Sequence, residues 1–163
     1  MEIRTACIED LGALTAIYNE EAEHGTATFD IHPKTEEQML RWFYDHNKDH
    51  HPLIVATEGS EVAGYASLSP YREKEAYLST VELSVYVARD HRRKGVAGAL
   101  MTEILKMARE DEMLHTVVSV ITSGNEASIH LHQRFGFRYS GTLHDVGMKF
   151  GSYLSIDNFE LQV

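Results

Sequence analysis

The sequence predicts an α/β (α+β) fold with a mixed sheet, and three observations lead to that prediction. Segments with strand-like alternation and segments with helical spacing follow one another along the whole chain. No repeat, low-complexity tract or linker divides the 163 residues, so we expect a single domain, 1–163. Apolar residues make up 43% and charged residues 25%, which is typical of globular proteins.

Two helices are expected near the start of the chain, after a short strand at residues 3–5. Apolar residues recur at helical spacing over 11–18, and Gly25 is expected to end that helix. A second helix is predicted over 35–47, with a threonine as its cap and acidic residues in its first turn. The segment between the two helices is expected to be extended or looped.

A strand-rich stretch occupies the middle of the chain. Residues 53–56 and 62–68 predict a hairpin, and residues 77–87 predict a third strand. Alternation in this third strand separates an aliphatic face from a polar and aromatic one. The aliphatic face holds Val81, Leu83, Val85 and Val87, and the other face holds Thr80, Glu82, Ser84 and Tyr86.

The period then returns to that of a helix, which Gly95 is expected to open. A buried strand is predicted over 116–121, a short helix over 125–135, and two final strands over 137–149 and 153–162. The predicted order of elements is therefore β-α-α-β-β-β-α-β-α-β-β.

The charge and the cysteine content narrow the functional classes. A formal net charge of -10 makes general nucleic-acid binding unfavourable, because phosphates would be repelled. The single cysteine excludes a disulfide within the chain and suits a reducing compartment. No signal peptide and no membrane-spanning run is visible, so we expect a cytoplasmic protein that binds no membrane.

One segment carries a chemical signal, the run from Asp90 to Gly98 between the third strand and the long helix. Arg92, Arg93 and Lys94 place three positive charges before two glycines and an alanine that begin the helix. Free N–H groups at a helix start and the helix dipole both favour an anion such as a pyrophosphate. A solvated basic turn is an equal alternative on the residues alone. A P-loop is disfavoured because no Gly-Lys-Ser/Thr ending is present.

The segment 92–97 resembles the acetyl-CoA pyrophosphate loop of the GNAT superfamily of N-acetyltransferases, whose pattern is Gln/Arg-x-x-Gly-x-Gly/Ala. The resemblance implies a mostly antiparallel central sheet flanked by helices, and acetyl-CoA as the co-substrate. It also implies a pantetheine contact along one strand and contacts to the lower part of CoA from a later helix. The implied cofactor-binding residues are Val85, Tyr86, Val87, Arg92, Arg93, Lys94, Gly95, Val96, Ala97, Gly98, Asn125 and Ser128.

Three blocks narrow the resemblance to the phosphinothricin and methionine sulfoximine acetyltransferase branch. They are 80–87, 124–137 and 147–151, all in the second half of the chain. The branch implies a small amino-acid-like substrate whose primary amine accepts the acetyl group. It also implies a homodimer.

Acetyl transfer requires a neutral amine and help for the leaving thiolate. Glu82 is the expected base, and a surface carboxylate is the alternative. His132 is expected to assist the oxyanion or the leaving sulfur, and a packed helix histidine is the alternative; many GNAT enzymes place a tyrosine there. We expect direct attack in a ternary complex and no metal, because His130 and His132 point to different sides of their helix.

The acceptor-binding residues are less sharply indicated. Arg72 and Lys74 are candidates to pair with a substrate carboxylate, with a solvated charged loop as the equal alternative. Phe29 and Tyr77 are candidates to form walls of the amine pocket, and each is equally a candidate for the core. Two other functions remain open, namely a protein or peptide N-acetyltransferase and a non-catalytic acyl-CoA-binding sensor domain.

Overall fold

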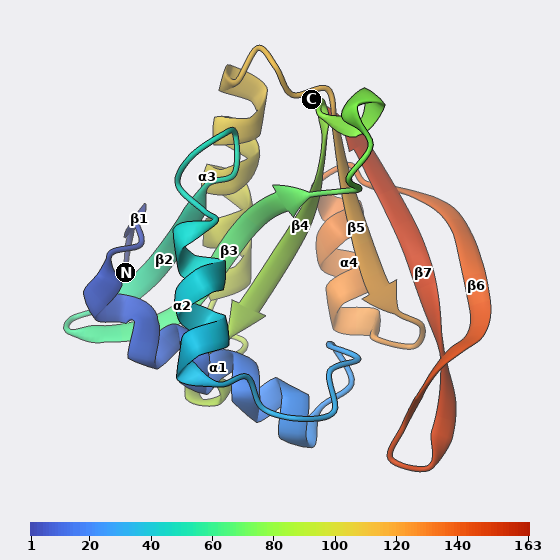
Figure 1. Ribbon diagram of the computed structural model, residues 1–163, viewed down its shortest axis with the longest axis horizontal. Coiled ribbons are helices and arrows are strands. Elements are labelled where there is room, and N and C mark those ends of the chain that lie inside the picture. Colours follow the sequence, from blue (N-terminus) through green and yellow to red (C-terminus); the bar gives the residue numbers. More distant parts are fainter.

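A seven-stranded sheet organises the molecule, which is described here for residues 1–163 by a computed structural model (Figure 1). The strand order is β1-β2-β3-β4-β5-β7-β6, and every neighbouring pair is antiparallel except β4 with β5. This confirms the predicted mixed, mostly antiparallel sheet. The strands are β1 (Glu2–Thr5), β2 (Leu53–Glu58), β3 (Glu61–Pro70), β4 (Thr80–Val87), β5 (Thr116–Thr122), β6 (Arg138–Lys149) and β7 (Ser152–Gln162).

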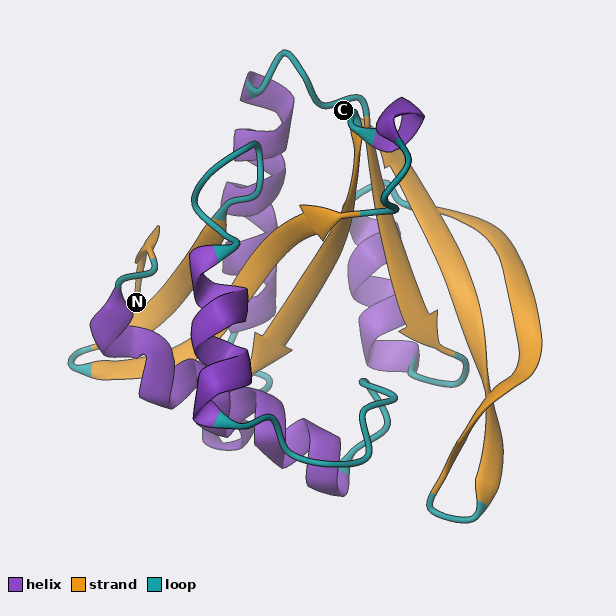
Figure 2. Cartoon of the chain, in the orientation of Figure 1, coloured by secondary structure: helices purple, strands orange, loops and turns teal.

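Four α-helices cover the two faces of this sheet (Figure 2). None of them is both long and apolar enough to span a bilayer. The helices are α1 (Leu11–His24), α2 (Glu36–Tyr44), α3 (Val96–Glu110) and α4 (Glu126–Arg134), with 3-10 turns η1 (Ile8–Asp10), η2 (Glu75–Tyr77) and η3 (Arg89–His91).

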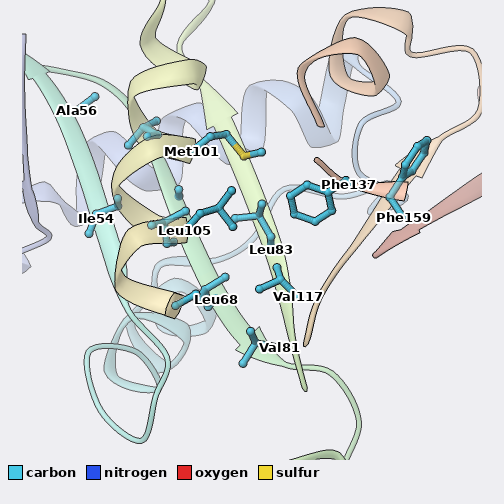
Figure 3. Close-up of a cluster of buried hydrophobic side chains, with 14 of the residues drawn as sticks. Ile54, Ala56, Leu68, Val81, Leu83, Met101, Leu105, Val117, Phe137 and Phe159 are labelled. Carbon is cyan, nitrogen blue, oxygen red and sulfur yellow. The ribbon is translucent and has the colours of Figure 1, made fainter. Parts of the chain in front are cut away.

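Alternation along β2 shows how the two faces are filled. Ile54 and Ala56 belong to the larger core under α3, whereas Leu53 and Val55 belong to the smaller core under α1 and α2. Because successive strand side chains point to opposite faces, α3 lies opposite α1 and α2. Figure 3 shows the larger core, in which α3 side chains such as Leu105 meet strand residues such as Leu83.

The parallel pair in the centre of the sheet is short, and this opens the molecule. β4 and β5 are paired only from Thr80 with Thr116 to Glu82 with Val118. Beyond that point the two strands diverge, β4 staying with β3 and β5 staying with β7 (Figure 1). The remainder of β4 therefore presents a free backbone edge to the gap.

Most predicted elements are confirmed, and the differences occur at their ends. The predicted strand 77–87 begins only at Thr80, because Tyr77 lies in a 3-10 turn and its N–H donates to the Lys74 carbonyl. The predicted helix 35–47 ends at Tyr44, and Asn47 follows in the left-handed region with φ of 55°. Asn125 caps α4 instead of lying within it, because its side chain accepts a hydrogen bond from the Ser128 N–H.

Candidate active site

A cavity of about 1060 Å³ occupies the gap between β4 and β5. It extends from the start of α3 past both strands to α4, and the loop after α1 forms another wall. It brings together most of the residues that the sequence singled out. Those that line it are Phe29, Glu82, Val85, Tyr86, Val87, Arg92, Arg93, Gly95, Val96, Ala97, Gly98, Asn125, Ser128 and His132.

The glycine-bearing turn before α3 has the geometry of an anion site. Gly95 has φ of 83° and forms the N-cap, and Arg93 also lies in the left-handed region with φ of 60°. The first intrahelical hydrogen bond runs from the Ala99 N–H to the Gly95 carbonyl at 3.1 Å. The N–H groups of the three preceding helix residues, Val96, Ala97 and Gly98, are therefore free at the edge of the cavity.

The three basic residues of this turn differ in their contacts. The Arg92 guanidinium lies 3.2 Å from the Glu21 carboxylate of α1 and donates to the Val87 carbonyl at 3.4 Å. Arg93 and Lys94 form no ion pair, and Arg93 lines the cavity whereas Lys94 does not. Arg92 thus joins the turn to α1, and its predicted contact with the cofactor stays a prediction.

Glu82 is the last residue of β4 that pairs with β5, and the cavity begins there. It is half-buried, faces α1 and α2, and forms no hydrogen bond or ion pair with the protein. Burial raises the pKa of its carboxyl group above the ordinary value. A carboxylate with a raised pKa is a stronger base towards an ammonium group, so the environment of Glu82 suits proton abstraction.

His132 is almost fully buried on the other side of the cavity. Its Nδ1 lies 2.7 Å from the Ser128 carbonyl, which can only accept, so Nδ1 carries the proton. Burial lowers the pKa of the imidazole, which keeps it neutral and leaves Nε2 as an acceptor for the Ser119 hydroxyl at 2.8 Å. The neutral ring therefore has no free N–H, and His132 and Ser119 both line the cavity.

Of the four predicted acceptor-binding residues, one lines the cavity and three do not. Phe29 lines the cavity and packs so closely on β6 that a Cβ at Gly147 would lie 2.5 Å from its ring. Arg72, Lys74 and Tyr77 lie in the β3–β4 connection and do not line it. The Arg72 guanidinium instead lies over the Tyr77 ring, 5.8 Å from its centroid. Their roles in binding stay predictions.

Among the lining residues that the sequence did not indicate, Ser119 and Glu21 contact predicted site residues. Ser119 is the only residue with a hydroxyl inside the β5 run Val117–Ile121, and a lone polar side chain in an aliphatic strand is a usable signal. Glu21 gave no such signal, because it is one of several acidic residues at the end of α1. Its carboxylate accepts a hydrogen bond from the Ala27 N–H at 3.0 Å and pairs with Arg92, so it holds the loop before Phe29.

Comparison with known proteins agrees with this geometry. The chain is 42% identical to a phosphinothricin N-acetyltransferase of Streptomyces coelicolor over 98% of this chain and 95% of that one. It is 39% identical to an L-methionine sulfoximine/L-methionine sulfone acetyltransferase of Pseudomonas aeruginosa, over 99% and 94% of the two chains.

Two solved structures are similar along their whole length. A ribosomal-protein-alanine N-acetyltransferase from Brucella melitensis superposes with a TM-score of 0.96 at 38% identity, covering 100% of both chains. A Salmonella typhimurium protein solved with its cofactor acetyl-CoA gives a TM-score of 0.95 at 34% identity, covering 99% of this chain and 93% of that one. Residues 14–137 match the acetyltransferase (GNAT) family, and the chain therefore belongs to that family.

Proposed function

We propose that residues 1–163 form one acetyl-CoA-dependent N-acetyltransferase domain that acetylates the primary amine of a small amino-acid-like substrate. The substrate class is that of phosphinothricin, methionine sulfoximine and methionine sulfone, for which two relatives are named. The observation that carries the proposal is Glu82, a half-buried carboxylate without a partner at the point where β4 and β5 separate.

The cavity offers acetyl-CoA a complementary surface at each end. The free N–H groups at the start of α3 and the cavity-lining Arg93 suit the pyrophosphate, and Lys94 is the next residue along the chain. The unpaired edge of β4 at Val85 to Val87 suits the amides of the pantetheine arm, since an extended chain can add to a free strand edge. Asn125 and Ser128 lie at the start of α4, on the opposite wall.

Glu82 removes a proton from the substrate ammonium, directly or through a water molecule. The neutral amine then attacks the thioester carbonyl in a ternary complex and forms the nitrogen–carbon bond. The carbon–sulfur bond breaks, the nitrogen loses its second proton to the leaving sulfur, and CoA leaves as the thiol. His132 acts together with Ser119 in this proposal, because Nε2 accepts a hydrogen bond from the Ser119 hydroxyl and both residues line the cavity. Binding of both substrates before the chemistry brings amine and thioester together without a covalent enzyme intermediate.

A thiol-release assay with acetyl-CoA tests the proposal. The acceptors are phosphinothricin, methionine sulfoximine, methionine sulfone and a peptide with an N-terminal alanine. We expect release with the amino-acid analogues and its loss in Glu82→Gln. Release with the peptide alone would contradict the substrate class.

The peptide is included because a specific observation favours it. The Brucella melitensis structure, with its TM-score of 0.96, carries the name of an enzyme that acetylates ribosomal-protein alanine. The sensor alternative predicts acetyl-CoA binding without release for any acceptor. The half-buried Glu82 argues against a sensor. Burying an unpaired carboxylate costs stability, and groups with such perturbed pKa values cluster at catalytic sites.

We further propose a cytoplasmic homodimer that binds no nucleic acid, no membrane and no metal. Exposed apolar side chains gather on β6, β7 and the turn between them, and such a surface suits a second copy of the chain. They are Leu143, Val146, Met148, Phe150 and Tyr153. Light scattering tests the dimer, and a monomer at micromolar concentration would exclude it.

A further inference from the structure

A second cavity, of about 320 Å³, lies on the α1 and α2 face of the sheet. It is formed by α1, α2, the loop between them, β3 and β4. Ser84 and Tyr86 line both this chamber and the main cavity, so the two are adjacent along β4. The proposed reaction makes no use of this chamber.

Paired strand residues form the floor of the chamber. Across β3 and β4, Tyr65 is opposite Tyr86, and Ser67 is opposite Ser84. The next pair on the same face is Ser69 opposite Glu82. The expected base therefore lies at one end of a row of hydroxyl groups, on the face that the chamber occupies.

The three serines differ in whether their hydroxyls are free. Ser69 lies 2.8 Å from Nε2 of His46, whose Nδ1 donates to the Trp42 carbonyl at 2.7 Å. The Ser69 hydroxyl is therefore committed to the histidine. Ser67 is 1% exposed, and neither its hydroxyl nor that of Ser84 forms a hydrogen bond with another protein group. These two hydroxyls are donors available to a ligand.

The charges around the chamber restrict what can enter it. Its basic residue, Lys34, lies 3.3 Å from the Asp30 carboxylate, which balances the charge of the ammonium group. The Tyr18 hydroxyl donates to the same carboxylate. Since no unpaired cation faces the chamber and Glu82 lies nearby, an anionic group is disfavoured whereas an uncharged hydrogen-bond acceptor is not. Trp42 and Tyr65 supply apolar walls.

The spacing matches a small amino acid. Residues two apart on a strand, such as Glu82 and Ser84, are separated by about 6.6 Å. An atom four single bonds from an α-amine lies about 5 Å from it in an extended chain. An amine held at Glu82 therefore places the end of a four-bond side chain near the Ser67 and Ser84 hydroxyls.

We propose that this chamber is the subsite for the acceptor's side chain, and that Ser67 and Ser84 donate hydrogen bonds to an uncharged polar group such as a sulfone, sulfoximine or carboxamide. The inference rests on the proposed function and names, within that substrate class, the chemistry that the enzyme selects. In this proposal β3, α2 and the loop after α1 select the acceptor's side chain, and they are separate from the residues that bind the cofactor.

The test compares methionine sulfone with methionine, which has the same chain length but lacks the sulfone oxygens. In Ser67→Ala and in Ser84→Ala we expect kcat/KM for methionine sulfone to fall about tenfold, the usual effect of one lost hydrogen bond, with kcat/KM for methionine unchanged. Ser60→Ala, at the exposed β2–β3 turn, is the matched control and should leave both unchanged. Thermal melting identifies any variant that fails to fold, and the two serines are tested separately.

An equal decrease in kcat/KM for the two amino acids, or no decrease for either, would overturn the proposed subsite. The proposed function would still stand if the wild type acetylates them. A wild-type enzyme that acetylates no small amino acid would remove both. A second arm uses phosphinothricin, whose phosphinate is anionic. We expect the wild type to have a lower kcat/KM for it than for methionine sulfone, and the reverse order would contradict the chamber's charge argument.

Discussion

The two ends of the proposed site recognise their ligands by different chemistry. At the start of α3 the chain presents free backbone N–H groups and the unpaired cations Arg93 and Lys94. In the chamber under α2 it presents the hydroxyls of Ser67 and Ser84 between aromatic walls, and its one lysine is paired with Asp30. Unpaired cations thus lie at the phosphate end of the site, whereas the lining of the chamber holds none.

Glu82 stands between these two ends, and its replacement has the largest expected effect. In Glu82→Gln we expect kcat to fall at least about 100-fold, because the amine loses its base, with the Kd for acetyl-CoA unchanged. In the wild type, kcat/KM should decrease as the pH falls through the raised pKa of this carboxyl group. Steady-state kinetics and calorimetric binding measure the two effects, and equal loss of binding would assign Glu82 to the cofactor end.

The same variant should be more stable than the wild type. A carboxyl whose pKa is raised on folding binds more protons in the folded state, so its contribution to stability becomes less favourable as the pH rises through that pKa. At neutral pH Glu82→Gln removes this penalty, and we expect a higher Tm. A Tm below that of the wild type would show that Glu82 serves the structure.

Ser119 and His132 are expected to act as one unit at the cofactor side. Ser119→Ala and His132→Ala should each lower kcat by about tenfold or more, and the double variant should lose no more than the worse single one. Additive losses would mean that the two residues act separately. His46→Ala, which breaks the equivalent pair with Ser69, is the control for simple loss of a buried histidine.

The two buried histidines also predict how stability depends on pH. Burial lowers the pKa of both His46 and His132, so the unfolded state binds protons more readily than the folded state. The free energy of unfolding should therefore decrease as the pH falls below about 6.5, the ordinary pKa of histidine. Urea unfolding between pH 7.5 and 5.5, conditions chosen around that value, should show a smaller decrease in His132→Gln.

The cofactor end predicts an effect on binding alone. In Arg93→Ala with Lys94→Ala we expect the KM for acetyl-CoA to rise about tenfold with little change in kcat, because the lost contacts are charge-assisted bonds to phosphate. Added salt should weaken binding to the wild type more than to the variant. Equal salt dependence in the two proteins would remove these residues from the phosphate site.

The smallest expected effect concerns the wall made by Phe29. In Gly147→Ala the added Cβ would lie 2.5 Å from the Phe29 ring, so the ring must move. We expect the KM for the acceptor to change a few-fold and the KM for acetyl-CoA to stay the same. Gly12→Ala is a matched control, since a Cβ there meets nothing within 4 Å.

Much of the cofactor end was predictable because it lies in one continuous segment. Strand β4, the turn at Gly95 and the start of α3 follow one another between residues 80 and 98, so local spacing and charge identify them. The acceptor side offered no such signal. Phe29 lies in the main cavity and Tyr77 does not, although both are aromatic residues in irregular segments.

The sequence by itself determined the order of the elements, the face of β4 that carries Glu82 and the basic turn before α3, because periodicity and turn chemistry are local properties. Only the tertiary structure decided that Ser119 holds His132, that Arg92 joins α1, and that Ser67 and Ser84 floor a chamber beside Glu82. Those contacts join segments far apart in the chain, and packing of the whole sheet against its helices selects them.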